Sequence, residues 1–301
     1  MMLILFKVVK DLNLGMATAV ELLEEGGFKI DNKPTAIVPL EAYLYLTNRL
    51  GIKPTLLQQV IVPEKEYEEE ITSFELLRKI RTQNGIPKSV FKYFSPQDTS
   101  LNSLEDSYLY YSVYSNFNDP FDCNLNLINF KREKAHYSGT RSKFLSELNN
   151  TGICCFTSVN DSILMWSHYA GHHKGFCLEF KYDDRKDGIN PWEVVYKKKF
   201  KTADYHTQKI DSFVHLIYSK SECWAYEKEL RTFIPNIKND EERKRLFDKG
   251  DLLSVYLGAK CSQELENKIK VILKAVYASK PQLYKAKLSD NEFKIVWEKR
   301  S

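Results

Sequence analysis

The segment GICCFTSVNDSILMWSHYAGHHKGFCLEFKY, residues 152–182, decides the fold class because its pattern changes twice within a short distance. β-Branched, aromatic and cysteine residues fill its two ends, GICCFTS and GFCLEFKY, which is typical of buried strands. Between them, Asn160 or Asp161 is suited to cap a helix that stops at Gly171. The segment therefore predicts a strand, a helix and a second strand in succession.

Strands and helices follow one another irregularly along the rest of the chain. Residues 205–220, YHTQKIDSFVHLIYSK, have an amphipathic helical pattern, with an apolar stripe of Ile210, Phe213, Val214 and Ile217. Residues 262–276 form a second such helix with Ser262 as its N-cap. The expected strands are SVFKYF, SYLYYSVY, WEVVYKKKF, LLSVYLG, LYKAKL and FKIVW. This mixture favours an α+β fold with a mixed or antiparallel sheet over a doubly wound parallel sheet.

The length of 301 residues and the charge pattern indicate more than one domain. Residues 1–60 are expected to form a small helical docking module, because helical stretches there end at Gly26–Gly27 and at Gly51. Residues 61–88 are expected to be an acidic linker, PEKEYEEE, followed by a helix with a capping box from Thr72 to Glu75. Residues 89–301 then form the α+β domain.

Composition excludes several classes of protein. No run approaches the roughly 20 apolar residues of a membrane span, and MMLILF is too short for a signal peptide, so a cytoplasmic location is expected. The six cysteines contain no C-x-x-C pair, so buried thiols and no metal site are expected. The net charge is +4 although residues 61–71 hold five acids and one Lys. The basic excess elsewhere suits a phosphate-bearing ligand or nucleic acid, but an ordinary Lys-rich surface is the simpler interpretation.

One charged stretch, WAYEKELRTF at residues 224–233, is a candidate site. On a strand, Glu227, Glu229 and Arg231 alternate and therefore share a face. A solvated sheet face and a ligand site both account for the pattern.

Two further clusters of polar and aromatic residues have alternative explanations. Core packing is the favoured explanation for Met165 and Trp166. The triplet Trp166, His168 and Tyr169 nevertheless places polar-tipped rings at one helix end, where they suit stacking on a base or nicotinamide. The turn FNDPFD, residues 117–122, holds Asn118, Asp119 and Asp122, which either form only a turn or position a ligand hydroxyl.

Other chemistries have weaker support. His168 and His172 have metal-ligand spacing on a helix, but Gly171 is expected to end the helix between them. A nucleophilic Cys154 or Cys155 paired with His168 has no local signature. The absence of G-x-G-x-x-G and of a P-loop disfavours a Rossmann dehydrogenase or a classical ATPase.

The N-terminal segment DLNLGMATAVELLEEGGFKIDNKPTAIVPLEAYLYL, residues 11–46, resembles the N-terminal helical domain of bacterial translation initiation factor two. The resemblance covers about 45 residues. It implies docking to a partner such as a ribosome or a nucleic acid. It does not imply translation initiation, because no GTPase sequence follows.

The blocks FNDPFD, MWSHYA…HKGF and W-x-Y-E-x-E-x-R, in this order, resemble the bacterial family called domain of unknown function 2971. The resemblance runs from about Val90 to Trp297. Many members have an Arg where this chain has Phe94. If that Arg binds phosphate in them, Lys92 or Arg231 would take its role here.

The order of these blocks is also similar to that of ADP-ribosyltransferase-like domains. This similarity implies NAD as a substrate, and a transferase or NAD glycohydrolase acting as a toxin or phage-defence effector. A carboxylate would stabilise the positive charge that develops on the ribose. The implied roles are catalysis by Glu229 and Glu227, cofactor binding by Lys92, Tyr93, Ser112, Trp166, His168, Tyr169 and Arg231, and structural or ligand positioning by Asn118, Asp119, Asp122 and Trp224.

Two alternatives stay open on the sequence alone. One is a nuclease or other phosphodiester-acting enzyme with His168, Lys92 and the two glutamates as its site. The other is a non-catalytic binding or regulatory protein in which the same residues form a structural network. Both enzyme hypotheses fail together if Glu229, Ser112, Tyr93 and His168 are scattered over the surface and do not gather at one cleft.

Overall fold

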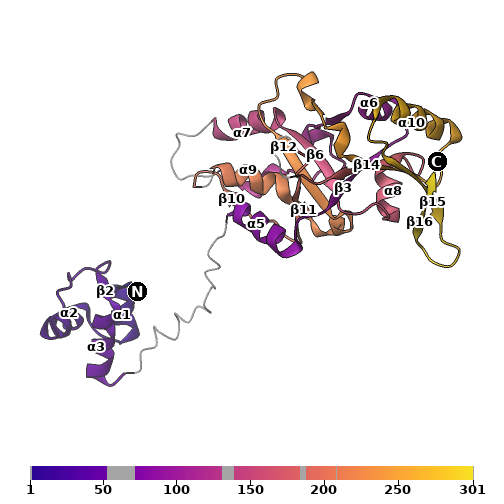
Figure 1. Cartoon of the computed structure of the whole chain (residues 1–301). Helices are drawn as coiled ribbons and strands as arrows, with labels where there is room; N and C mark the ends of the chain where they lie inside the picture. Colours follow the sequence, from indigo (N-terminus) through magenta and orange to yellow (C-terminus); the bar gives the residue numbers. More distant parts are fainter. Residues whose placement is uncertain (1, 53–71, 131–138, 184–187, 208, 301) are drawn as a thin grey trace. The chain divides into compact units, whose positions relative to one another are not determined.

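A computed structural model describes residues 2–52, 72–130, 139–183, 188–207 and 209–300 of the chain. The chain divides into two compact units, Met1–Glu70 and Ile71–Ser301 (Figure 1). The acidic run expected to act as a linker lies outside the described residues. No helix in the described part of the chain is long and apolar enough to cross a membrane.

In its described residues 2–52, the first unit packs three helices around a short two-stranded ribbon. Strands β1 (Met2–Ile4) and β2 (Ile37–Pro39) pair antiparallel, and the helices are α1 (Leu5–Asp11), α2 (Met16–Glu25) and α3 (Leu40–Leu50). Leu5, Leu23, Tyr43 and Leu46 are fully buried in its core. Helix α3 ends at Gly51, whose φ of 64° is left-handed, so the predicted stop is confirmed.

The second unit is built on a mixed sheet, and α+β is therefore the correct fold class. Within the described residues, eight strands pair in the order β16-β15-β14-β7-β3-β6-β12-β8. Among the described pairs of this eight-stranded sheet, β14 and β15 run parallel and the others are antiparallel. The strands are β16 (Ile295–Arg300), β15 (Gln282–Leu288), β14 (Leu252–Leu257), β7 (Phe176–Lys181), β3 (Ser89–Phe94), β6 (Gly152–Thr157), β12 (Glu229–Ile234) and β8 (Trp192–Glu193).

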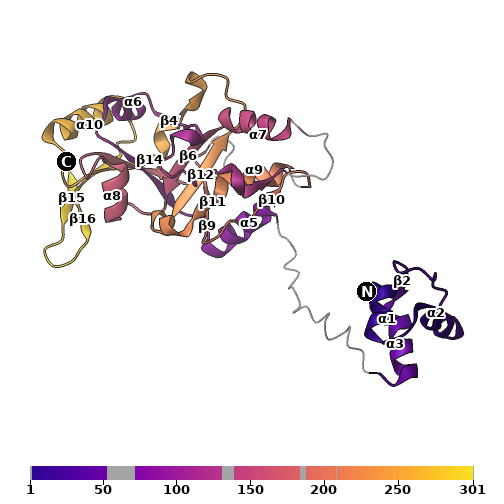
Figure 2. The same ribbon diagram turned by 180° about the vertical axis from the view of Figure 1, so that it is seen from behind.

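Strand alternation assigns side chains to the two faces of this sheet. On β7, Phe176, Leu178 and Phe180 pack in one core cluster, whereas Cys177 packs in another on the opposite face. The first cluster includes apolar side chains from helices α6 (Asp98–Glu105) and α10 (Gln263–Val276). These two helices lie together at the end of the unit away from α7 (Thr140–Asn149) and α9 (Lys209–Tyr218) (Figures 1 and 2).

The opposite face carries two separate core clusters. Helix α8 (Ile163–Tyr169) contributes Trp166 to one, beside β7, β14 and β16. Helix α5 (Ser73–Asn84), α7 and α9 build the other, beside β6. Three short pairs of strands complete the described part of the second unit: β10 (Ala203–Asp204) with β5 (Ile128–Asn129), β11 (Ser219–Ser221) with β9 (Val195–Lys197), and β13 (Lys244–Leu246) with β4 (Tyr108–Tyr110).

Several local predictions are confirmed and others need correction. Ser262 caps α10 through Leu265 N, and Thr72 and Glu75 form the predicted capping box of α5. Helix α8 is capped by Ser162, whose hydroxyl accepts from Met165 N, and not by the predicted Asn160 or Asp161, so it begins one or two residues later than expected. Ile210 does not belong to the buried stripe of α9, since it is 82% exposed.

Two expected strands are also shorter in the structure. The stretch SYLYYSVY forms a strand only at Tyr108–Tyr110, and WEVVYKKKF divides into β8 and β9. Ser112 then forms a single antiparallel bridge with Ile153.

Candidate functional site

The candidate site is a cavity of about 310 Å³ where two neighbouring strands of the sheet diverge. Strands β3 and β6 pair only at Phe91 and Thr157, and then separate. The carbonyl of Cys155 on the diverging part of β6 accepts a hydrogen bond of 3.0 Å from Lys92 Nζ. Lys92 thus spans the gap and satisfies a backbone oxygen there. Residues of β3, β6, β12 and the FNDPFD loop line the space between the two strands.

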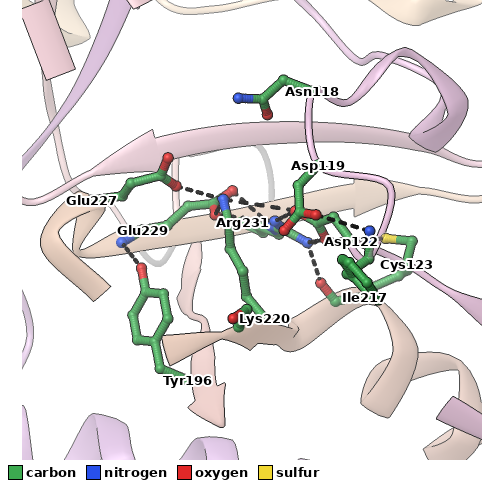
Figure 3. A network of polar contacts seen from close by, with 12 residues as sticks. Asn118, Asp119, Asp122, Cys123, Tyr196, Ile217, Lys220, Glu227, Glu229 and Arg231 are labelled. Atoms are coloured by element: carbon green, nitrogen blue, oxygen red, sulfur yellow. Dashed lines mark hydrogen bonds and ion pairs between the residues drawn. The ribbon is translucent and has the colours of Figure 1, made fainter. Parts of the chain in front are cut away.

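A buried ion-pair network forms one wall of this cavity, with Arg231 between Glu229 and Asp122 (Figure 3). Arg231 Nη1 and Nη2 donate to the two oxygens of Asp122 at 2.8 and 2.5 Å. Its Nε donates to Glu229 Oε1 at 2.7 Å and its Nη2 to Glu229 Oε2 at 3.0 Å. Nη1 also donates to the carbonyl of Ile217 at 2.6 Å. All five guanidinium N–H donors are paired, so this fully buried charge is well compensated.

Lys220 joins the two glutamates of the network. Its Nζ lies 2.5 Å from Glu227 Oε2, 2.7 Å from Glu229 Oε2 and 3.7 Å from Asp122 Oδ2. Lys220 reaches this position from the short strand β11 and is only 6% exposed. The network therefore holds three carboxylates and two cations, with one negative charge in excess when all five groups are ionised.

The route by which Glu227 enters the network differs from the strand prediction. Glu227 is the last residue of a 3₁₀ helix, η3 (Glu222–Glu227), and β12 begins only at Glu229. Lys228 between them has a left-handed φ of 43°, which turns the chain into the strand. The Lys228 side chain is exposed, while both glutamates are buried. A sharp turn, and not strand alternation, places the two carboxylates together.

The two glutamates have opposite shifts in pKa. Burial, together with the neighbouring charge of Glu229, raises the pKa of Glu227 despite its contact with Lys220. Burial would also raise the pKa of Glu229, but Arg231 and Lys220 lower it to about 2. Glu229 is thus a fixed negative charge at neutral pH, and Glu227 is the carboxylate whose protonation is more easily changed.

Tyrosine hydroxyls complete the surroundings of the glutamates. Tyr169 OH donates to Glu227 Oε1 at 2.5 Å, and burial followed by the charge of Glu227 raises the pKa of Tyr169. Asn118 Nδ2 donates to the Tyr169 hydroxyl at 3.4 Å. On the other side, the backbone N–H of Glu229 donates to Tyr196 OH at 2.8 Å. Tyr169 thus orients the carboxylate of Glu227, and Tyr196 holds the backbone of Glu229.

Most of the site residues predicted from the sequence line this one cavity. They are Lys92, Tyr93, Ser112, Asn118, Asp122, Tyr169, Glu227, Glu229 and Arg231. The Tyr93 hydroxyl donates to the carbonyl of Val159 at 3.1 Å, so its ring is held at the cavity wall. The ring of Phe117 lies 5.3 Å from the guanidinium carbon of Arg231 and adds an aromatic surface to the lining.

Four predicted residues lie outside the cavity lining. Trp166 is fully buried, its Nε1 donates to the carbonyl of Asn160, and its ring packs against Tyr93 and Trp297, so it does not face a ligand. The Asp119 carboxylate accepts from Phe121 N at 2.8 Å and shapes the FNDPFD turn. His168 and Trp224 form an aromatic cluster with Tyr226.

Lys220 is a central residue of this candidate site that the sequence patterns did not predict. A Lys between two serines is an ordinary surface pattern, so local sequence gave no sign of its burial. The three carboxylates around it were the available signal, because buried acids require compensating positive charge.

The cysteines and histidines offer no alternative centre in the described part of the chain. Cys154 is fully buried, and burial raises the pKa of the Cys155 thiol well above its usual value, which makes a reactive thiolate unfavourable. Cys223 is exposed, contrary to the expectation of buried thiols. Among the residues described, no group of three or more His, Cys, Asp or Glu is arranged to hold a metal ion.

Comparison with known proteins gives one match. The model of a family described as protein of unknown function (DUF2971) matches residues 165–232. This segment contains Tyr169, Lys220, Glu227, Glu229 and Arg231, which belong to the cavity lining. No curated protein and no solved structure matched the chain. The comparisons do not support the resemblance of the N-terminal module to translation initiation factor two.

Proposed function

We propose that this protein is an NAD-using enzyme that cleaves the nicotinamide–ribose bond, as an ADP-ribosyltransferase or NAD glycohydrolase. The observation that carries the proposal is the pair of cavity-facing glutamates with opposite pKa shifts that share the ammonium of Lys220. Pairs of carboxylates whose surroundings separate their pKa values in this way divide the work of acid–base and charge stabilisation in enzymes that cleave sugar bonds.

The chemistry assigns a different task to each glutamate. When the C–N bond between ribose and nicotinamide breaks, its electron pair leaves with neutral nicotinamide and positive charge develops on the ribose. Glu229, held ionised by Arg231 and Lys220, would stabilise that charge. Glu227 would accept the proton of the water or acceptor hydroxyl that forms the new C–O bond. The aromatic rings of Phe91, Tyr93 and Phe117 supply a surface for the nicotinamide.

The size of the cavity is consistent with this use. Its volume of about 310 Å³ lies at the lower end of the range typical of small-molecule sites. It is therefore suited to the reacting part of a ligand. We place the nicotinamide and its ribose there.

A second candidate, ligand binding without turnover, is favoured by a different observation. Every donor of Arg231 is already paired inside the protein, so the guanidinium has no free N–H to hold a pyrophosphate. Such a saturated network is also what a purely structural role requires. The predicted contact of Arg231 with a phosphate is therefore withdrawn from the proposal, and its role is to orient Glu229.

The decisive experiment measures free nicotinamide after incubation of the full-length protein with NAD. The wild type is expected to release nicotinamide, and Glu227→Gln and Glu229→Gln are each expected to lower the rate by about 100-fold or more. Glu264→Gln, on the exposed side of α10, is the matched control and should leave the rate unchanged. Tryptophan fluorescence verifies that each variant is folded.

Two outcomes would contradict the enzyme proposal. One is a wild-type protein that releases no nicotinamide, and the other is equal turnover by folded Glu229→Gln. Calorimetric binding of NAD without release would instead support the non-catalytic candidate.

A further inference from the structure

A second cavity of about 340 Å³ adjoins the first, and strand β11 contributes to both. Lys220 lines both cavities, whereas its neighbours Ser219 and Ser221 line only the second. The FNDPFD loop is divided in the same way, because Asp122 belongs to the first cavity and Phe121 to the second. The remaining lining consists of Leu127, Lys197, Lys198, Lys199 and Phe200.

The second cavity has an excess of positive charge. Lys197, Lys198 and Lys199 line it, and Lys201 follows two residues later. Lys198 pairs with Glu222 at 3.6 Å, but both side chains are largely exposed, so the pair compensates little charge. Within the described ranges, no ion pair is found for Lys197, Lys199 or Lys201.

Lys197 is the most informative of these cations. It is half-buried, and its Nζ donates to the Ser219 hydroxyl at 3.3 Å. Burial, and then the charge of Lys201, lower its pKa, and the charge of the Asp211 carboxylate opposes them only in part. These are the surroundings of an ammonium group that has too little negative charge near it. An anion bound in the cavity would supply that charge.

Two aromatic rings lie exposed at the same cavity. Phe121 is 59% exposed and Phe200 is 49% exposed, and their ring centroids are 6.2 Å apart with a tilt of 59°. Exposed rings beside a concave surface commonly mark a ligand site. Flat aromatic groups such as nucleobases stack on rings of this kind, with little dependence on which base is present.

We infer that this second cavity binds a nucleotide, with its phosphate at the lysines and its base against Phe121 and Phe200. The volume of the cavity suits a single nucleotide. The hydroxyls of Ser219 and Ser221 add hydrogen-bonding groups next to the lysines. The inference goes beyond the proposed cleavage of NAD, because Lys197, Lys198 and Lys199 do not line the carboxylate cavity.

The test is calorimetric titration of the full-length protein with AMP, adenosine and inorganic phosphate. AMP is expected to bind at least about ten-fold more tightly than either fragment, because only AMP uses both the charge and the rings. The double variant Lys198→Gln/Lys199→Gln and the variant Phe200→Ala are each expected to weaken AMP binding by about ten-fold. All three positions are exposed, so these substitutions leave the core intact.

Two controls distinguish AMP binding in the second cavity from binding in the carboxylate cavity and from nonspecific attraction to positive surface charge. Lys294→Gln/Lys299→Gln removes two exposed lysines on the β15–β16 hairpin and should not alter AMP binding. Ser112→Ala, which lies in the lining of the carboxylate cavity and not in that of the second cavity, should also bind AMP as the wild type does. The inference is overturned if AMP does not bind, if phosphate or adenosine binds as tightly as AMP, or if the Lys198→Gln/Lys199→Gln protein keeps the wild-type affinity.

Discussion

Arg231 and Asp122 face each other in a two-point ion pair, with Nη1–Oδ1 and Nη2–Oδ2 distances of 2.8 and 2.5 Å. They are separated by 109 residues in the chain, and both are buried. The pair fixes the FNDPFD loop against strand β12. It therefore sets the position of the loop that separates the two cavities.

Arg231→Met is expected to lower the free energy of unfolding of the second unit by about 3–5 kcal/mol, because it leaves Asp122 and Glu229 buried without their main partner. Denaturant titration followed by tryptophan fluorescence measures this directly. All four tryptophans lie in the second unit, so the signal does not include the first. Lys268→Gln breaks the exposed pair with Glu264 and should cause no measurable loss. A loss for Arg231→Met no larger than for this control would contradict the role of the network in stability.

Glu229→Gln is expected to show a stability deficit that depends on pH. The pKa of Glu229 is lowered to about 2 in the folded state, so its ionised form contributes stability above the usual carboxyl pKa. This contribution, about 3 kcal/mol for a shift of this size, decreases as pH falls toward 2. The difference between wild type and variant in denaturant titrations should therefore be largest above about pH 5 and shrink below pH 4. A constant difference from pH 7 to pH 3 would show that the ionised carboxylate is not the cause.

Lys220→Met is also expected to lower the free energy of unfolding, but this loss should depend on pH differently from that of Glu229→Gln. Lys220 lowers the pKa of Glu227, which burial and Glu229 raise. Without Lys220, the pKa of Glu227 rises further, so Glu227 takes up a proton on folding at a higher pH. The variant is expected to lose about 3 kcal/mol or more at pH 8 and less at pH 5.5. An equal loss of stability at about pH 8 and at about pH 5.5 would contradict this electrostatic explanation. Lys220→Arg keeps the positive charge and should therefore recover part of the stability.

The sequence patterns predicted several strands and two of the helix caps correctly, because these depend on neighbouring residues. Strands β6 and β7 follow from their apolar composition, and Ser262 and Thr72 from N-cap chemistry. The pairing of β3 with β6 at a single position depends on tertiary packing instead. The cavity that results could not be predicted from the sequence.

The position of Glu227 and Glu229 on one face was predicted correctly, but for an incorrect reason. Glu227 and Glu229 do face the same cavity, but the left-handed turn at Lys228 brings them together. The burial of Lys220 could not be predicted from local sequence, because a Lys between serines is compatible with either environment. Core packing was the favoured explanation for Trp166, and its complete burial confirms it.

The backbone of β3 leaves no room for a side chain at Gly175, the glycine of the HKGF block. A Cβ atom at this position would lie 2.0 Å from the carbonyl oxygen of Phe94 on β3. Gly175→Ala is therefore expected to destabilise the second unit by more than about 2 kcal/mol in denaturant titration, because backbone must move to admit the methyl group. Gly139→Ala is the matched control, since a Cβ there meets no atom within 4 Å. Equal stability of the two variants would show that β3 can shift without cost.

Tyr169→Phe tests the link between the network and the proposed chemistry. The hydrogen bond from Tyr169 OH to Glu227 Oε1 lowers the pKa of Glu227, so its removal should raise that pKa further. If Glu227 accepts a proton during cleavage of NAD, the rate falls at low pH as Glu227 becomes protonated. The acid side of the profile of kcat/KM for nicotinamide release should then move to higher pH in Tyr169→Phe. Tyr226→Phe, a neighbouring aromatic outside the cavity lining, should leave the profile in place. A shift to lower pH, or no shift in an active and folded Tyr169→Phe protein, would exclude Glu227 as the proton acceptor.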